Sequence, residues 1–441
     1  MNKAFKAIWS DVRQSFVTTS EIQSSHGKRS KASVSLSVAT VLLATSGLVS
    51  AAYVETGTLG DKASWETAEY NYNWGLGAMN ASSAYALGFY GQNTTTGVMD
   101  SGAWLGNPDL DPPRITATHV TGVYGSSGNR YPQSIYATIQ KGVVPTAAEG
   151  QPFTEGEEFD VKGDYTLGLN DAHGTQVTGV IGAERNGEYG HGVAFKANVV
   201  VGNTGATDNN NYGPFQDYNY YFKGYKALAD AVNAGNGEYR GGMVNNSYGT
   251  NTKIYSSGGH RLTPDEMSEL LAGSGNYDRA SAAYAVTFSG DYSFLGLNDV
   301  PGADQYSTNP SAFEWEYMYF KLKYGDKPSF LDGAYDAVKG TNVILSWAAG
   351  NQDRGTPYLK GLYPYFHPEA EKNWLNAVGV MQTRGDNDQY MQATYCKAGL
   401  AKWWSMSGPT AYPGIGTTYV TTDLENGRLT TTGFNGTSAS D

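Results

Sequence analysis

Apolar segments rich in β-branched residues alternate along this chain with segments that have helical spacing. The apolar segments, which we expect to be strands, lie at residues 96–100, 197–201, 243–246, 342–348 and 374–380. Helices are expected at residues 79–89, 173–183, 222–234 and 328–338. Strands that are apolar on both faces and separated by helices form parallel sheets covered on both sides. The sequence therefore predicts an α/β fold with a mostly parallel central sheet and helices on both faces.

Three polar residues follow expected strands. Asp100 ends the first strand, and Ser247 and Asn351 come shortly after two later ones. The carboxyl ends of parallel strands meet at one edge of the sheet, where such folds bind their ligands. We therefore expect these three side chains to lie close together.

An aspartate, a histidine and a serine occur in this chain order, each beside glycine and other small residues. Asp100 lies in Asp-Ser-Gly, His173 in His-Gly-Thr, and Ser438 in Gly-Thr-Ser. Each motif alone has a structural explanation, because such sequences form turns and a histidine at a helix start can simply cap or pack. Together with Asn351 in Ala-Ala-Gly-Asn, they indicate an acyl-transfer site.

Each of these residue types has a role in that chemistry. A serine hydroxyl is a weak nucleophile and needs a base to accept its proton, for which His173 is the candidate. Asp100 would fix the tautomer of the imidazole and stabilise the imidazolium. Asn351 and the backbone N–H of Ser438 would donate hydrogen bonds to the oxyanion.

These motifs together resemble the subtilase family of serine peptidases, in which the order is Asp…His…Ser. The resemblance runs from about Trp65 to Asp441 and includes His-Gly-Val-Ala at residues 191–194 and Asn-Ser-Tyr-Gly at residues 246–249. It implies a subtilisin-like three-layer fold and a secreted endopeptidase that works through an acyl-enzyme. The implied catalytic residues are Asp100, His173, Ser438 and Asn351.

The same resemblance implies a substrate cleft. Its first specificity pocket would be lined by Ser247, Tyr248, Gly249, Ala348, Ala349 and Gly350. Small walls would accept a large apolar side chain, whereas Tyr248 would instead narrow the pocket. An extended peptide would pair with residues 247–249 as an added strand.

The N-terminal segment has the pattern of an export signal. Residues 1–51 hold six of the 30 basic and two of the 42 acidic residues, and a moderately apolar run at residues 32–52 ends in small residues. A membrane-spanning helix is the alternative, although the run is rich in Ser, Thr and Gly. The long extension before the run resembles the extended signal peptide of Gram-negative autotransporters. It implies export across the inner membrane to the cell surface, outer membrane or medium.

We expect a signal peptide at residues 1–52, a linker at 53–64 and a peptidase domain at 65–441. Two long segments, at about 105–170 and 250–327, interrupt the alternation as insertions, either as surface structure or as walls beside the cleft. The chain ends three residues after Ser438, where the family continues with a long helix. We therefore expect a truncated fragment without activity, and an outer-membrane β-barrel encoded beyond residue 441.

Composition excludes some partners and cofactors. The net charge of −12 argues against nucleic acid, which needs a basic face. The lone Cys396 has no partner for a disulfide within the chain, and Ser405 stands where related autotransporter peptidases place a second cysteine. We expect no cofactor. Calcium, common in subtilases, has only weak candidate ligands here, at residues 109–111, 208–211 and 386–388.

Two other functions are compatible with the sequence. One is a surface adhesin that kept a subtilase scaffold without turnover. The other is a periplasmic hydrolase without a barrel. The presence of all four catalytic residue types favours a peptidase that takes protein or peptide substrates.

Overall fold

The computed structural model shows the chain as two units, Met1–Ala52 and Tyr53–Asp441. It describes residues 5–10, 15–20, 57–110, 113–126, 128–129, 152–164, 172–187, 190–204, 217–237, 241–248, 328–351, 357–383, 386–410, 419–423, 428–432 and 434–441. The expected insertion at 250–327 and the apolar run at 32–52 lie outside the described residues.

The first unit contains an antiparallel hairpin. Strand β1 (Phe5–Ser10) pairs with β2 (Ser15–Ser20), with Ile8 opposite Val17. Across the parts of the chain that the structure describes, no helix is both long and apolar enough to cross a membrane.

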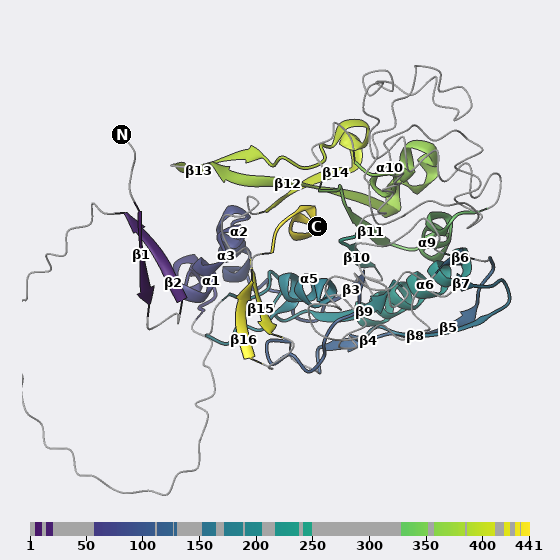
Figure 1. Cartoon of the computed structure of the whole chain (residues 1–441), viewed down its shortest axis with the longest axis horizontal. Coiled ribbons are helices and arrows are strands. Elements are labelled where there is room, and N and C mark those ends of the chain that lie inside the picture. Colours follow the sequence, from purple (N-terminus) through teal and green to yellow (C-terminus); the bar gives the residue numbers. More distant parts are fainter. Residues whose placement is uncertain are drawn as a thin grey trace, which may run out of the picture. The chain divides into compact units, whose positions relative to one another are not determined.

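The second unit is built on an eight-stranded sheet (Figure 1). Its strand order is β13-β12-β11-β10-β3-β9-β4, with β14 also paired to β12. All pairings are parallel except that of β12 with the edge strand β13, which confirms the expected mostly parallel sheet. The strands are β3 (Thr95–Asp100), β4 (Ile115–Ala117), β9 (Asn198–Asn203), β10 (Gly242–Asn246), β11 (Val343–Ala348), β12 (Trp374–Thr383), β13 (Asp386–Gln392) and β14 (Ser405–Pro409).

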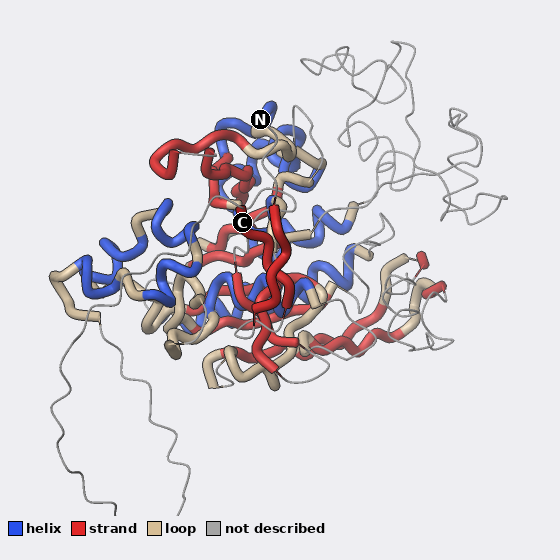
Figure 2. Tube along the Cα trace, turned by 60° about the vertical axis from the view of Figure 1, so that its left-hand side comes forward, coloured by secondary structure: helices blue, strands red, loops and turns tan. Residues whose placement is uncertain are grey.

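Helices cover both faces of the sheet, as Figure 2 shows. On one face α6 (Tyr218–Gly235) packs on α9 (Phe330–Val338), and their apolar sides share a core with Val244 and Leu345 of the sheet. On the other face α5 (His173–Gly182) and α11 (Thr437–Ser440) share a core with Val98 and Val199. Successive strand residues face opposite sides, so this three-layer arrangement requires the runs that are apolar on both faces.

Local sequence explains where α6 and α9 begin. Asp217 caps α6, its side chain accepting a hydrogen bond from the N–H of Tyr220 at 3.0 Å. Ser329 and Asp332 form a capping box at the start of α9.

The remaining elements surround the sheet. They are η1 (Lys62–Trp65), α1 (Ala68–Tyr72), α2 (Trp74–Ala78), α3 (Ala81–Ala86), β5 (His119–Val123), β6 (Gly128–Asn129), β7 (Pro152–Phe153), β8 (Glu158–Lys162), α10 (Leu359–Phe366), η6 (Pro368–Asn373), η7 (Gly399–Trp404), β15 (Tyr419–Asp423) and β16 (Arg428–Thr432). The segment at 105–170, expected as an insertion, includes β4, which extends the main sheet, and the antiparallel pair β5–β8.

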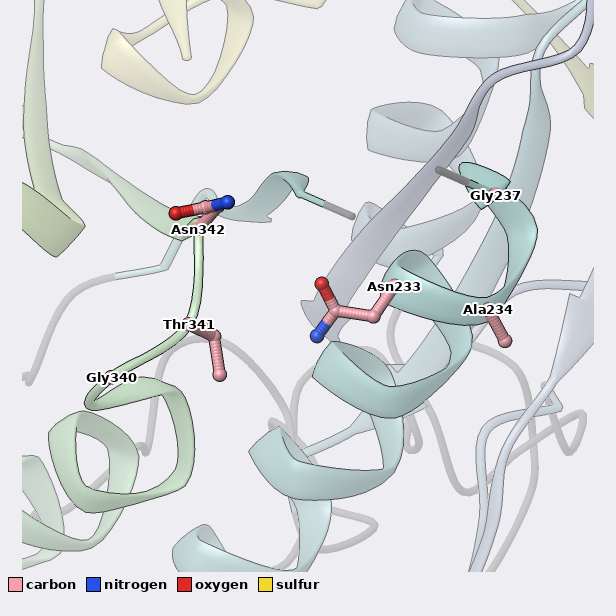
Figure 3. A pocket seen from close by; sticks show the side chains of 6 residues that line it. All are labelled: Asn233, Ala234, Gly237, Gly340, Thr341 and Asn342. Atoms are coloured by element: carbon pink, nitrogen blue, oxygen red, sulfur yellow. The ribbon is translucent and has the colours of Figure 1, made fainter. Parts of the chain in front are cut away.

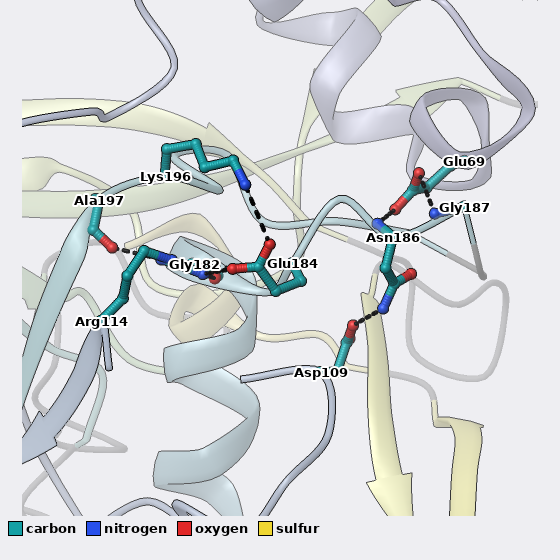
Figure 4. Close-up of polar contacts among 9 residues, drawn as sticks. All are labelled: Glu69, Asp109, Arg114, Gly182, Glu184, Asn186, Gly187, Lys196 and Ala197. Carbon is teal, nitrogen blue, oxygen red and sulfur yellow. Dashed lines mark hydrogen bonds and ion pairs between the residues drawn. The ribbon is translucent and has the colours of Figure 1, made fainter. Parts of the chain in front are cut away.

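A polar network holds the loop that follows α5 (Figure 4). The buried carboxylate of Glu69, on α1, accepts hydrogen bonds from the backbone N–H groups of Asn186 and Gly187, both at 2.9 Å. The side chain of Asn186 donates to Asp109 at 2.9 Å. Glu184 in the same loop is paired with Arg114. The network thus fixes the carboxyl end of the helix that begins with His173.

We expect Glu69→Ala to lower the free energy of unfolding by about 2 kcal/mol, because two charge-assisted hydrogen bonds are lost. Chemical denaturation followed by tryptophan fluorescence measures the change. The matched control is Asp230→Ala, which removes an exposed carboxylate paired with Lys226 and should cost less than about 0.5 kcal/mol. Equal effects of the two substitutions would contradict this account of the loop.

Candidate active site

Asp100 ends the buried strand β3 and is itself inaccessible to solvent. Its Oδ1 accepts hydrogen bonds from the backbone N–H of Ser101 at 2.7 Å and from Nδ1 of His173 at 2.9 Å. The end of the buried strand β3 therefore fixes the position of the Asp100 carboxylate, which in turn orients the imidazole of His173.

His173 is the first residue of α5, as the helical spacing predicts. The helix start lies very close to the turn after Asp100. A Cβ added at Gly174 would be 2.2 Å from the carbonyl oxygen of Gly102, which itself has a φ of +86°. The N–H of Gly174 donates to Oγ of Ser101 at 2.9 Å. Glycine at both positions is thus required for the approach of His173 to Asp100.

Ser438 lies in the first turn of α11, after Gly436 with a φ of +82°. The helix packs beside α5, since Ala439 shares an apolar cluster with Val177 and Val180. The hydroxyl of Ser438 donates to the carbonyl oxygen of Ser247 at 2.6 Å. A hydroxyl has one proton, so in this resting arrangement Ser438 does not donate to His173.

Asn351 is held against the start of α11. Its Oδ1 accepts hydrogen bonds from N–H and Oγ1 of Thr437, at 2.8 and 3.0 Å. Thr437 Oγ1 also accepts from the N–H of Gly350 at 3.0 Å. With Oδ1 engaged, Nδ2 is the donor that Asn351 can offer to a ligand, beside the first turn of α11.

The expected substrate-binding residues divide between the two faces of the sheet. Ser247 faces α11, and its Oγ donates to Asn245 at 3.0 Å. Tyr248 is instead buried in the core on the α6 side, where its ring packs on Trp347 and under the amine of Lys360. Alternation of side chains along the strand explains this direction, which points away from the expected pocket.

The other expected pocket residues follow β11. Ala348 and Ala349 are buried, and Ala349 packs with Val378 and Cys396. Gly350 has a φ of +118°, and a Cβ there would be 2.7 Å from the ring of Tyr358. Gly249 lies outside the described residues.

The sequence did not indicate several residues that support these groups. Ser101 and Thr437 each stand beside a recognised residue, but their role depends on contacts between distant segments. Tyr395 is buried and accepts a hydrogen bond from the N–H of Gly436, while burial raises its pKa. Asp441 contacts the ends of β10 and β11. Adjacency to a motif was the only signal that the sequence offered for them.

Among the candidate calcium ligands, Asp109 is the one whose side-chain contacts the described part of the chain includes. Within the described ranges, no three His, Cys, Asp or Glu side chains form a cluster that could hold a metal ion. Asp109 is hydrogen-bonded by Asn186, and residues 386–388 belong to strand β13. Residues 111 and 208–211 lie outside the described part of the chain.

Cys396 is buried, and its N–H donates to the carbonyl of Gly350 at 3.0 Å. Ser405, on β14, accepts a hydrogen bond from Asn376.

A separate groove lies at the carboxyl ends of α6 and α9 (Figure 3). It is lined by Asn233, Ala234, Gly237, Gly340, Thr341 and Asn342. Asn342 directly precedes β11, whereas Asn351 follows that strand, so the groove is at the opposite edge of the sheet. None of its residues is charged, and we assign it no ligand.

The fold and the site define a class of protein: a three-layer α/β domain with an Asp–His pair and a serine on a following helix. Sequence comparison gives the family. The Subtilase family matches residues 91–440, which is most of the chain. The protein therefore belongs to the subtilase family. Residues 1–50 match the Extended Signal Peptide of the type V secretion system, so the chain carries a signal for export to the cell surface or beyond.

Curated relatives match shorter stretches. An extracellular serine protease of Serratia marcescens is 31% identical over 163 residues, 37% of this chain and 12% of the relative. The serotype-specific antigen 1 of Mannheimia haemolytica is 34% identical over 72 residues, 16% of this chain and 7% of the relative. The matches thus span only a small part of these much longer proteins.

Solved structures of peptidases are also similar. The nisin leader peptidase NisP from Lactococcus lactis is 14% identical, with 84% of this chain and 81% of that chain covered and a TM-score of 0.38. The prenylagaramide maturation protease PagA is 11% identical, with coverages of 82% and 75% and a TM-score of 0.38.

Proposed function

We propose that this protein is an exported serine endopeptidase that hydrolyses peptide bonds through an acyl-enzyme on Ser438. The observation that carries the proposal is the hydrogen bond from His173 Nδ1 to the buried Asp100. His173 begins α5, which packs beside the helix of Ser438. Membership of the subtilase family and the export signal support it.

In the proposed mechanism, the hydroxyl of Ser438 turns from the Ser247 carbonyl to Nε2 of His173. Catalytic hydrogen bonds often form only when substrate is bound, so the resting geometry is compatible with this step. His173 takes the proton as Oγ attacks the scissile carbonyl, and Asp100 stabilises the imidazolium. His173 then protonates the leaving amine, and water attacks the acyl-enzyme by the same route.

The negative charge of the tetrahedral intermediate needs donors at a fixed place. Asn351 Nδ2 and the N–H of Ser438 supply them, because Thr437 holds the asparagine against α11. Preorganised donors of this kind lower the barrier by about 2.7–4 kcal/mol each, a value measured for the equivalent asparagine of subtilisin.

The substrate in this proposal is an extended segment of a protein outside the cell. Its backbone would pair with residues 247–249, with Ser247, Ala348, Ala349 and Gly350 beside its side chain at the cleavage site. Tyr248 would support the strand from within the core, since its ring is buried there. Anchoring to the outer membrane by a barrel beyond residue 441 completes the proposal.

A cleavage assay tests this function. The full-length gene product should hydrolyse an unfolded protein substrate and internally quenched peptides, and Ser438→Ala should abolish hydrolysis. Ser440→Ala, two residues away on the same helix, is the matched control and should retain activity. Hydrolysis that persists in Ser438→Ala, or a wild-type protein that only binds host surfaces, would contradict the proposal.

A further inference from the structure

The side chain of Asp441 lies between the nucleophile helix and two strands of the sheet. Ser346, on β11, donates a short hydrogen bond to its Oδ1, and the hydroxyl of Ser247, directly after β10, lies 3.4 Å from its Oδ2. The backbone N–H groups of Asn246 and Ala348 also donate to this carboxylate. All four of these groups lie at the carboxyl ends of β10 and β11.

Ser247 links this carboxylate to the nucleophile. Its Oγ contacts Asn245 Oδ1 at 3.0 Å, the carbonyl of Ser438 at 3.2 Å and Asp441 Oδ2 at 3.4 Å. Its own carbonyl accepts the proton of the Ser438 hydroxyl. The end of β10 is therefore tied to α11 both through Ser438 and through Asp441.

We propose that Asp441 is a positioning residue whose ionised carboxylate fixes the ends of β10 and β11 beneath Ser438 and so keeps the nucleophile reactive. This role rests on the proposed function of Ser438. An ionised carboxylate only accepts hydrogen bonds, which suits the hydroxyl of Ser346, the two backbone N–H groups and the shared proton of Ser247. The protonated acid must itself donate one bond, so one of the serine hydroxyls must turn from donor to acceptor.

The charge of Asp441 changes within the physiological range. Burial raises its pKa from 3.8 to about 7, although the hydrogen bonds that the carboxylate accepts act in the opposite direction. Strands β10, β11, β12 and β14 carry no ionisable side chain. Nearby ionisable groups on other elements include His173 on α5, which packs beside α11, its partner Asp100 on β3, and Tyr225 on α6, which interacts electrostatically with Asp100 and Asp441. Burial raises the pKa of Tyr225 well above its usual value, so it stays neutral.

The pH dependence of nucleophile reactivity tests the role. We would measure the rate constant of fluorophosphonate labelling of the full-length protein from pH 5 to pH 9. In the wild type, protonation of His173 removes the base and protonation of Asp441 lowers the reactivity by a further factor of about five to ten, so the logarithm of the rate should fall with a slope steeper than one as the pH drops through 7. Asp441→Asn mimics the neutral acid, and its slope should be one, with a plateau about five- to tenfold lower.

Two further variants sharpen the measurement. Ser346→Ala removes a donor to Asp441 without touching Ser438 and should raise the pH at which Asp441 loses its proton. This variant tests the role even if Asp441→Asn folds poorly. Asp230→Asn, which replaces an exposed carboxylate on α6, should leave the pH profile of labelling unchanged.

The pH dependence of stability offers an independent check. Between about pH 4 and pH 7 the carboxyl group of Asp441 keeps its proton in the native state and has lost it in the unfolded state. The free energy of unfolding of the wild type should therefore decrease as the pH rises through this range, and that of Asp441→Asn should not.

The outcomes separate the two proposals. A wild-type protein that takes up no probe at any pH contradicts the proposed function, and the positioning role with it. A labelled wild type whose profile is unchanged by both Asp441→Asn and Ser346→Ala leaves the peptidase function standing and overturns the role of Asp441.

Discussion

His173→Ala is expected to lower kcat for peptide hydrolysis by about 10⁶-fold, the loss found when the corresponding histidine of subtilisin is removed. Without the imidazole, no base accepts the proton of Ser438, whose hydroxyl already donates to the carbonyl of Ser247 in the resting state. Steady-state kinetics on a quenched peptide would measure the change. KM should change little, because His173 contributes to the transition state rather than to ground-state binding.

The chain offers a matched control in a second His–Asp pair. Nε2 of His119 on β5 lies 2.5 Å from Oδ1 of Asp160 on the paired strand β8, but both side chains are exposed. His119→Ala should leave kcat within a factor of two. A loss of less than 100-fold in His173→Ala, or an equal loss in both variants, would contradict the assignment of the base.

Asp100→Asn should lower kcat by about 10⁴-fold while the protein still folds. Asparagine has nearly the same shape, but it cannot stabilise the imidazolium, and its amide favours the wrong tautomer of His173. Because Asp100 Oδ1 accepts from both Ser101 and His173, the carboxylate fixes the turn and the imidazole together.

The control for this variant is Asp160→Asn in the exposed pair, for which we expect unchanged kinetics. Thermal unfolding distinguishes a catalytic loss from a folding defect, since Asp100→Asn should keep a cooperative transition near that of the wild type. An Asp100→Asn variant with nearly normal kcat would show that the hydrogen bond to His173 has no part in the reaction.

Much of the fold could be predicted because its signals are local. The apolar run that forms β11 and the helical spacing of α5 lie within short windows, and the structure confirms both. Strand β4 gave no such signal: it has three residues and is defined by its pairing with β9.

The site was predictable to a different degree for each residue. Asp100 and His173 could be named because strand ends and helix starts bring them to one edge of the sheet. The direction of the Tyr248 side chain could not be predicted, because it depends on which face of β10 packs against α6. The contacts of Asp441 with Ser346 and Ser247 join segments almost 100 and 200 residues apart, which no local pattern encodes.

The most direct test of the central claim is to locate a fluorophosphonate adduct on the full-length protein. After labelling at pH 8, proteolysis and mass spectrometry should find one adduct per chain, on the peptide that contains Ser438, and none in His173→Ala over the same time. An adduct on another serine, or no adduct on a folded protein that carries Asp100, His173 and Asn351, would contradict the claim that Ser438 is the nucleophile of a peptidase.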